Sequence, residues 1–170
     1  TDPVITITGD NPATVELGDA YTDAGATATD LDEVSVTSTS NVDTDTVGSY
    51  SVLYTATDAS GNSSTATRTV NVVDTTSPTI NSPSSFTVQE NQLSIGTVEV
   101  SDAGDVIFSV TGSDIIVIDQ NGVLSFVTAP DFESQTTYII VVTVTDASGN
   151  SVSQEITINI TNDPDDDDDD

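Results

Sequence analysis

The chain contains no cysteine, histidine, tryptophan, methionine or lysine, and Arg68 is its single basic residue. Without cysteine no disulfide can form. Without cysteine or histidine the common nucleophile–base pairs of enzymes are also excluded. No segment approaches the roughly 20 apolar residues that a membrane-spanning helix needs. These absences favour a non-enzymatic protein that is not inserted in a membrane.

Acidic residues dominate the charge, with 29 aspartates and glutamates and a formal net charge of −28. Such a chain cannot neutralise phosphates, so nucleic acids and anionic membrane surfaces are excluded as partners. Self-repulsion opposes compaction, and bound cations would relieve it. Carboxylate and carbonyl oxygens are the ligands that calcium prefers. The composition therefore predicts Ca²⁺ as a cofactor.

Two segments of the chain are copies of one pattern. Residues 43–74 align without a gap with residues 131–162, and the hexapeptide Thr-Asp-Ala-Ser-Gly-Asn is identical at 57–62 and 145–150. Each copy begins with alternating apolar and polar residues, which predict a β-strand. The Asp-Ala-Ser-Gly-Asn segment is typical of a turn, so each copy is predicted to be a β-hairpin. Two copies predict two related domains.

Short strands are predicted elsewhere, and no segment has the apolar stripe of a helix. The first half carries candidates at Val4–Thr8, Ala26–Thr29 and Val34–Thr39, and the second half at Phe86–Val88, Thr97–Val100, Val106–Thr111, Ile115–Ile118 and Val123–Phe126. About seven short strands per domain predict an all-β protein of two tandem Greek-key β-sandwiches. The predicted organisation is a domain at 1–74, a linker at 75–79, a domain at 80–163 and an acidic tail at 164–170.

The tail ends in six aspartates, which repel one another and can bury nothing. Three interpretations stay open: a linker to further sequence, a solubilising end, or a cation-binding strand.

The second half resembles a cadherin repeat over about residues 78–165. Several short segments follow the order of that family's motifs: Glu90-Asn91, Asp102 with Asp105, Asp131-Phe132-Glu133, Asp146, and Asn162-Asp163-Pro164-Asp165. The first half resembles bacterial immunoglobulin-like domains related to hyalin repeats, through Gly48-Ser-Tyr50, the hexapeptide at 57–62 and Arg68-Thr-Val-Asn-Val.

The cadherin resemblance implies calcium between consecutive domains. The internal junction would use Asp43, Asp45, Asp74, Asp102, Asp105 and Asp146, with Glu16 as a further candidate. A second junction would combine Glu90, Asp131, Glu133, Asn162 and Asp163 with Asp30, Asp32 and Asp58 of a neighbour. Gln89 replaces the family's proline and the spacing of Asp102 and Asp105 is loose, so we expect one or two ions per junction.

The same residues have other interpretations. Aspartates in turns are often only solvated turn formers. Asp131 and Glu133 stand two residues apart, whereas glycosidases place their two carboxylates across a cleft, so catalysis is not expected. Arg68 shares the parity of Val70 and Val72 along its strand, which predicts an inward-pointing side chain paired with a carboxylate.

The sequence thus predicts a non-enzymatic, extracellular structural protein, rigidified by calcium, whose subunits join head to tail into a surface filament. The first alternative is a stalk fragment from a large calcium-dependent bacterial adhesin with further repeats. The second is a carbohydrate-binding accessory module, ranked last because the chain has no tryptophan to stack on a glycan. Strand donation between sheet edges is an alternative to calcium bridging.

Overall fold

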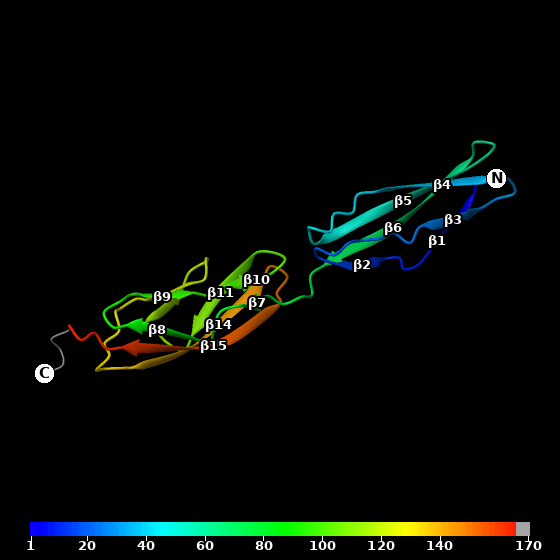
Figure 1. The fold of residues 1–170 in the computed structure, drawn as a ribbon. Coiled ribbons are helices and arrows are strands. Elements are labelled where there is room, and N and C mark those ends of the chain that lie inside the picture. The colour runs from blue at the N-terminus through cyan, green and yellow to red at the C-terminus, as the bar shows by residue number, and fades with distance from the viewer. Residues whose placement is uncertain (166–170) are drawn as a thin grey trace. The chain divides into compact units, whose positions relative to one another are not determined.

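The computed structural model describes residues 1–165 and contains two compact units, Thr1–Thr75 and Thr76–Asp170. Every regular element among the described residues is a β-strand (Figure 1). The prediction of an all-β fold is therefore confirmed. The last five residues of the predicted tail, 166–170, lie outside the described part of the chain.

The first unit is built from six strands, β1 (Val4–Ile7), β2 (Ala13–Glu16), β3 (Ala26–Thr29), β4 (Val34–Ser40), β5 (Gly48–Asp58) and β6 (Ser63–Val73). One sheet has the order β2-β6-β5-β4 and the other contains only β1 and β3. Strand β2 runs parallel to β6, and the other pairs are antiparallel.

The second unit has nine strands, β7 (Thr79–Ile80), β8 (Ser85–Gln89), β9 (Ser94–Thr97), β10 (Val100–Ser101), β11 (Val106–Thr111), β12 (Ile116–Ile118), β13 (Val123–Phe126), β14 (Thr137–Asp146) and β15 (Ser151–Thr161). Its main sheet has the order β11-β14-β15-β8, facing a sheet of order β12-β13-β9. Strands β7 and β10 form a small separate pair.

The two copies of the repeat form the predicted hairpins, β5–β6 and β14–β15, both long and antiparallel. The alternation of the sequence becomes an alternation of burial, because successive side chains of a strand point to opposite faces. Val52, Tyr54 and Ala56 are buried in the first hairpin, as are Ile156 and Ile158 in the second. Gly61 and Gly149 adopt positive φ, at 89° and 93°.

The cores of the two units differ in size and chemistry. The second unit packs a cluster of aliphatic residues with Phe126, and Tyr138 meets that ring edge-on at 5.4 Å between centroids. The first unit has a smaller buried cluster of Val52, Tyr54 and Val70. Its core also contains Arg68, which is only 2% exposed.

Arg68 forms the ion pair that the sequence predicted, and its partner is Asp23 at 3.1 Å. The guanidinium also donates to the Tyr54 hydroxyl and to the backbone carbonyls of Thr8, Asp10 and Gly25. Arg68, the only basic side chain of the protein, thus connects two loops of the first unit to its central hairpin.

Several strand predictions were wrong in detail. Strand β2 (Ala13–Glu16) was missed because it is defined by its parallel pairing with the distant strand β6, which leaves no local signal in the sequence. The strand predicted at Thr97–Val100 is in fact the end of β9 and the start of β10. Gly96 and polar neighbours leave Ile95 as the single large apolar residue of β9, so the sequence carries no period-two signal there. The expected seven strands per domain are six and nine.

Candidate metal centre

The turn of the first hairpin is organised by the carboxylate of Asp58. Oδ1 accepts the amide hydrogens of Ser60 and Asn62 at 2.9 and 2.8 Å, and Oδ2 accepts the Asn62 side-chain amide at 2.7 Å. The side-chain hydrogen bond from Asn62 is the main reason that the pKa of Asp58 lies below its usual value. The residue is 6% exposed, so this aspartate acts as an internal brace of the turn.

Asp146 repeats that arrangement in the second hairpin. Its Oδ1 accepts the amide hydrogens of Ser148 and Asn150, both at 2.8 Å, and its Oδ2 accepts the Asn150 side-chain amide at 2.8 Å. Burial, the largest single effect, would raise the pKa of Asp146. The hydrogen bonds from Asn150 and the turn amides outweigh it, so that the pKa is lowered. The residue is ionised above this lowered pKa.

A third turn of the same kind went unnoticed in the sequence. Asp119 Oδ1 accepts the amide hydrogens of Asn121 and Val123, at 2.8 and 2.9 Å, and the Gly122 amide donates to the Asp119 carbonyl. The shared signal is an aspartate followed three residues later by glycine, as in Asp58 with Gly61. The same spacing also occurs at Asp45 and Gly48, where Gly48 begins β5, so the spacing alone does not identify the turn.

Asp146 differs from Asp58 in belonging to a close group of carboxylates among the described residues. A carboxylate oxygen of Asp102 lies within 4.8 Å of one of Asp146. Strand pairing explains this proximity, because β10 ends at Ser101 and β11 begins opposite Asp146. Asp102 itself accepts the Gly104 amide at 3.1 Å. Among residues 1–165, none of the close groups of three carboxylates includes Asp105, the other acid predicted for this loop.

The acids predicted for the internal junction in the first unit gather at one end of that unit. The Leu17 amide donates to the Val73 carbonyl at 2.7 Å, and the Gly18 amide donates to the Thr44 carbonyl at 2.8 Å. These bonds place the loop that carries Asp43 and Asp45 beside Glu16 and the end of β6, which precedes Asp74. Asp43 Oδ1 accepts the Asp45 amide at 3.0 Å, and Glu16 accepts the Thr75 amide at 2.6 Å.

Three of the predicted acids in the second unit form a compact group. Carboxylate oxygens of Glu90, Asp131 and Glu133 all lie within 4.8 Å of one another. Glu90 is 2% exposed, and its oxygens accept the amide hydrogens of Phe132 and Asp163, both at 2.8 Å. A buried carboxylate held in place by two backbone amides is a pre-oriented ligand.

The remaining two predicted residues join the same group. The Asn162 side-chain amide donates to Glu133 Oε1 at 3.2 Å, and Asp163 is tied to Glu90 through its backbone amide. Hydrogen bonds from Ser134, first from its hydroxyl, hold the pKa of Asp131 below its usual value. All five residues predicted for this end of the second unit are thus brought together.

The acids predicted for the opposite end of the first unit are not gathered in the same way. Asp30 Oδ1 accepts the Thr1 hydroxyl at 2.6 Å and the Leu31 amide at 2.7 Å, which is local bracing. Asp58 braces its own turn. Within residues 1–165, no close group of three carboxylates contains Asp30, Asp32 or Asp58.

The donor set fits calcium by its chemistry. Every side chain in the Glu90–Asp131–Glu133 group offers oxygen, and the neighbouring Asn162 and backbone carbonyls offer more. Calcium takes six to eight oxygen ligands in flexible geometry, whereas zinc and copper favour the nitrogen and sulfur ligands that this chain lacks. Three carboxylates this close repel one another without a cation.

Comparison with known proteins bears on both units. Residues 5–72 match the family model of the bacterial surface protein, Ig-like domain. Hyalin from Strongylocentrotus purpuratus is 35% identical over 120 residues, covering 67% of this chain, and hyalin from Lytechinus variegatus is 35% identical over 116 residues, also covering 67%. The chain spans only 9% and 21% of the lengths of these relatives.

Among solved structures, mouse cadherin-23 EC22-24 covers 94% of this chain at 19% identity with a TM-score of 0.54, and 67% of that chain is covered. At this identity the likeness concerns the fold. The resemblances to an immunoglobulin-like surface domain, to hyalin and to cadherin repeats are confirmed. The matched family model describes a domain of bacterial surface proteins, and the structural likeness is to cadherin domains. No helix among the described residues is long and apolar enough to cross a membrane.

Proposed function

We propose that this chain is a non-enzymatic extracellular structural protein whose β-sandwich domains are rigidified by Ca²⁺ bound at their ends. The observation that carries the proposal is the group of Glu90, Asp131 and Glu133, with carboxylate oxygens within 4.8 Å of one another. Together with Asn162 and Asp163 they form an oxygen-rich half-site at one end of the second unit.

The internal site would combine acids from three segments. Asp102 and Asp146 would supply one side, with Asp105, and Asp43 and Asp45 the other. Asp74 precedes Thr79 by five residues, and Thr79 pairs with Ser101, next to Asp102. Five extended residues span at most about 18 Å, so the connecting segment is short enough to carry a ligand to this site.

The bound cation would supply charge neutralisation and a fixed set of ligand positions. In a molecule with a net charge of −28, clustered carboxylates otherwise push their segments apart. The residues of this chain do the rest: the amides that hold Glu90 and Asp146 keep the carboxylates in position before any ion arrives.

Assembly follows from the open half-sites. Glu90, Asp131 and Glu133 would meet Asp30, Asp32 and Asp58 of a neighbour, and repeated head-to-tail contacts of this kind build a filament. Hyalin and cadherin-23 are both longer than this chain, which favours the alternative of a stalk made of further repeats. Both forms share the same calcium chemistry.

The test of the calcium sites uses a matched pair of variants. Asp146→Asn and Asp58→Asn disturb the same turn in the same way, but Asp146 alone has Asp102 beside it. In calorimetric titration of the dilute monomer with CaCl₂, we expect Asp146→Asn to weaken binding at least about tenfold and Asp58→Asn to leave it unchanged. Equal losses in the two variants would contradict the internal site.

The half-site at the other end has its own pair. Glu133→Gln removes a charge from the group, whereas Glu155→Gln removes one from an exposed position on β15. We expect sedimentation velocity in millimolar calcium to show a ladder of larger species that chelator reverses and that Glu133→Gln abolishes. A calcium-independent ladder would point instead to strand donation. A monomer in both conditions would leave the stalk form as the explanation.

A further inference from the structure

Strand β11 is an open edge of the second unit. It lies at the end of the order β11-β14-β15-β8, and among the described residues it pairs with β14 alone. Alternate residues of such an edge direct their backbone N–H and C=O groups away from the sheet. Natural edges are protected by charge, proline or a bulge, and β11 (Val-Ile-Phe-Ser-Val-Thr) has no charge or proline and pairs in continuous register.

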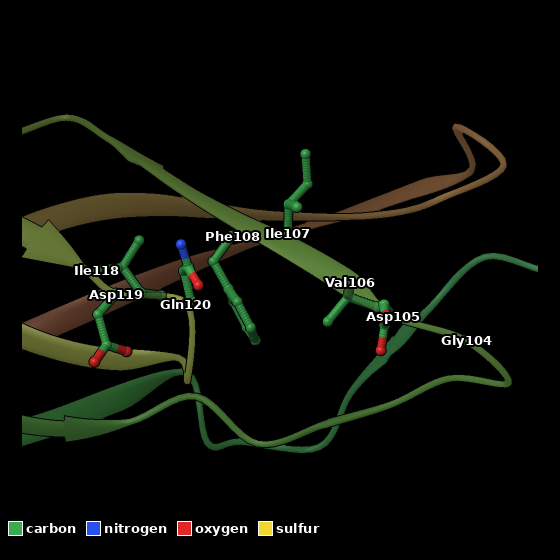
Figure 2. A pocket seen from close by; sticks show the side chains of 8 residues that line it. All are labelled: Gly104, Asp105, Val106, Ile107, Phe108, Ile118, Asp119 and Gln120. Carbon is green, nitrogen blue, oxygen red and sulfur yellow. The ribbon is translucent and has the colours of Figure 1, made fainter.

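A cavity of about 860 Å³ lies along this edge, between the first half of β11 and the turn that follows β12. Figure 2 shows the side chains of Val106 and Phe108 on one side of β11, toward Asp119 and Gln120, and Ile107 on the opposite side. Ile107 is 70% exposed. A strand laid beside β11 would therefore find apolar neighbours for both of its faces.

The cavity is acidic at both ends. Asp105 precedes β11, and Asp119 lies across the cavity in the turn that its own carboxylate braces. Because that turn is held by two amide hydrogen bonds to Asp119, this charge has a fixed position. A partner segment that carries cations at its ends would meet both carboxylates.

The first unit offers an internal contrast. Strand β4 is the edge of its sheet, and Val34 pairs with Asp58 as Val106 pairs with Asp146. Ser35 occupies the place of Ile107, and the cavity beside the start of β4 measures about 230 Å³. At this place along the edge, the first unit therefore has a serine and a small cavity, and the second unit has an exposed isoleucine and a larger cavity.

We propose that the β11 edge binds an extended peptide segment of a partner protein, with β-branched or aromatic side chains in its centre and a lysine or arginine at each end. The segment adds a strand antiparallel to β11 and extends the main sheet of the second unit. A second copy of this chain is a poor occupant, since it carries −28 charges and a single arginine that is buried.

The probe for the test is a fluorescein-labelled octapeptide of alternating valine and threonine with a lysine at each end. Its counterpart has glutamate at each end. With the full chain in chelator, so that calcium neither binds Asp105 nor drives assembly, we expect saturable fluorescence anisotropy for the lysine peptide. We also expect at least about tenfold weaker binding of the glutamate peptide, and slowed amide exchange at residues 106–111 but not at 34–40.

One matched pair of variants and one further variant locate the site. Ile107→Asp and Ser35→Asp each place a charge on an exposed edge position, and Asp119→Asn removes the charge that lies across the cavity. We expect Ile107→Asp and Asp119→Asn to weaken the binding of the lysine peptide, at least about tenfold for Ile107→Asp, and Ser35→Asp to leave it unchanged. Equal binding of both peptides, unchanged binding by Ile107→Asp, or dimers of the chain formed through β11 would overturn the proposal.

Discussion

The two hairpins of this molecule have the same register but different interiors. Arg68 occupies the position in the first hairpin that Ile156 occupies in the second, paired with Val52 and Ile140 respectively. Tyr54 likewise corresponds to Val142. Arg68 is 2% exposed and Ile156 is fully buried, so both positions are interior.

The difference reflects how much apolar surface each unit can supply. The second sheet of the first unit has only β1 and β3, and its buried apolar cluster is small. The Arg68 guanidinium adds polar contacts to this small core, because it binds Asp23, Tyr54 and three carbonyls. Among the described residues, no buried polar side-chain atom is without a hydrogen-bond partner. The same hairpin register can therefore pack against an aliphatic core or against a polar core in which every buried polar atom has a hydrogen-bond partner.

The largest effect on stability is expected from Arg68→Ile, which gives the first hairpin the residue that the second hairpin has at this position. Asp23 would lose its only ion-pair partner among the described residues and keep hydrogen bonds from Tyr54 and Tyr21, and three carbonyls would each lose a charged donor. We expect the free energy of unfolding of the first unit to fall by about 3–5 kcal/mol. Urea unfolding followed by hydrogen exchange, which reports each unit separately, measures it.

The second unit of the same molecule is the control for Arg68→Ile, since its unfolding should not change. If the first unit kept its stability with isoleucine at this position, the polar network would be dispensable.

The turns of the two hairpins should lose the same stability when their glycine is replaced by alanine, although the cores of the two units differ. Gly61 and Gly149 have φ of 89° and 93°, and a Cβ at either position would meet no atom within 4 Å. The cost of alanine is therefore conformational, about 1–2 kcal/mol, and equal for Gly61→Ala and Gly149→Ala. Thermal unfolding of the two variants measures it, and a difference well above 1 kcal/mol would show that the shared hexapeptide is not equivalent in the two units.

The smallest expected effect is a dependence on pH carried by Asp23. Burial would raise the pKa of Asp23, but hydrogen bonds from Tyr54 and Tyr21 and the charge of Arg68 lower it below its usual value. A carboxylate with a lowered folded pKa stabilises the fold above its unfolded pKa, and this contribution is lost as pH falls through the folded pKa. The free energy of unfolding falls by on the order of 1 kcal/mol for each pH unit that separates the unfolded and folded pKa of Asp23, and the fall begins below about pH 4.

Comparing the wild-type chain with Asp23→Asn isolates this contribution from the protonation of the other acids. The stability difference between the two proteins should shrink as pH falls below 4 in urea unfolding of the first unit. A difference that stayed constant with pH would show that the charge of Asp23 is not what Arg68 requires.

Strand prediction succeeded where alternation is long or bounded by turn residues. Ala26–Thr29, Val106–Thr111 and Val123–Phe126 were predicted with the bounds that the structure gives. Strand β2 has four residues and pairs in parallel with β6, a contact between distant segments that leaves no local signal. The partner of Arg68 was also beyond reach, because Asp23 lies in a loop 45 residues earlier and is positioned only by the folded sandwich.

Some residues of the candidate site could be predicted from the sequence, and others could be distinguished only from the fold. Glu90, Asp131 and Glu133 were selected through the cadherin resemblance, and the fold brings them together. Composition alone could not separate them from the other acids of the chain. Asp58 and Asp146 share one hexapeptide, yet only Asp146 belongs to a close group of carboxylates among the described residues. The cause is the short pair β7–β10, which places Asp102 near that turn.

The parallel pairing of β8 with the last strand, β15, has a mechanical consequence. In the second unit β8 and β15 run side by side over five registered pairs, Ser85 with Thr157 through Gln89 with Thr161. Tension applied to the two ends of the unit slides these strands along each other, so the hydrogen bonds share the load rather than opening one after another. Resistance to forced extension is governed by the unfolding rate, not by the equilibrium free energy of unfolding. Chain connectivity alone therefore orients this sandwich to withstand shear.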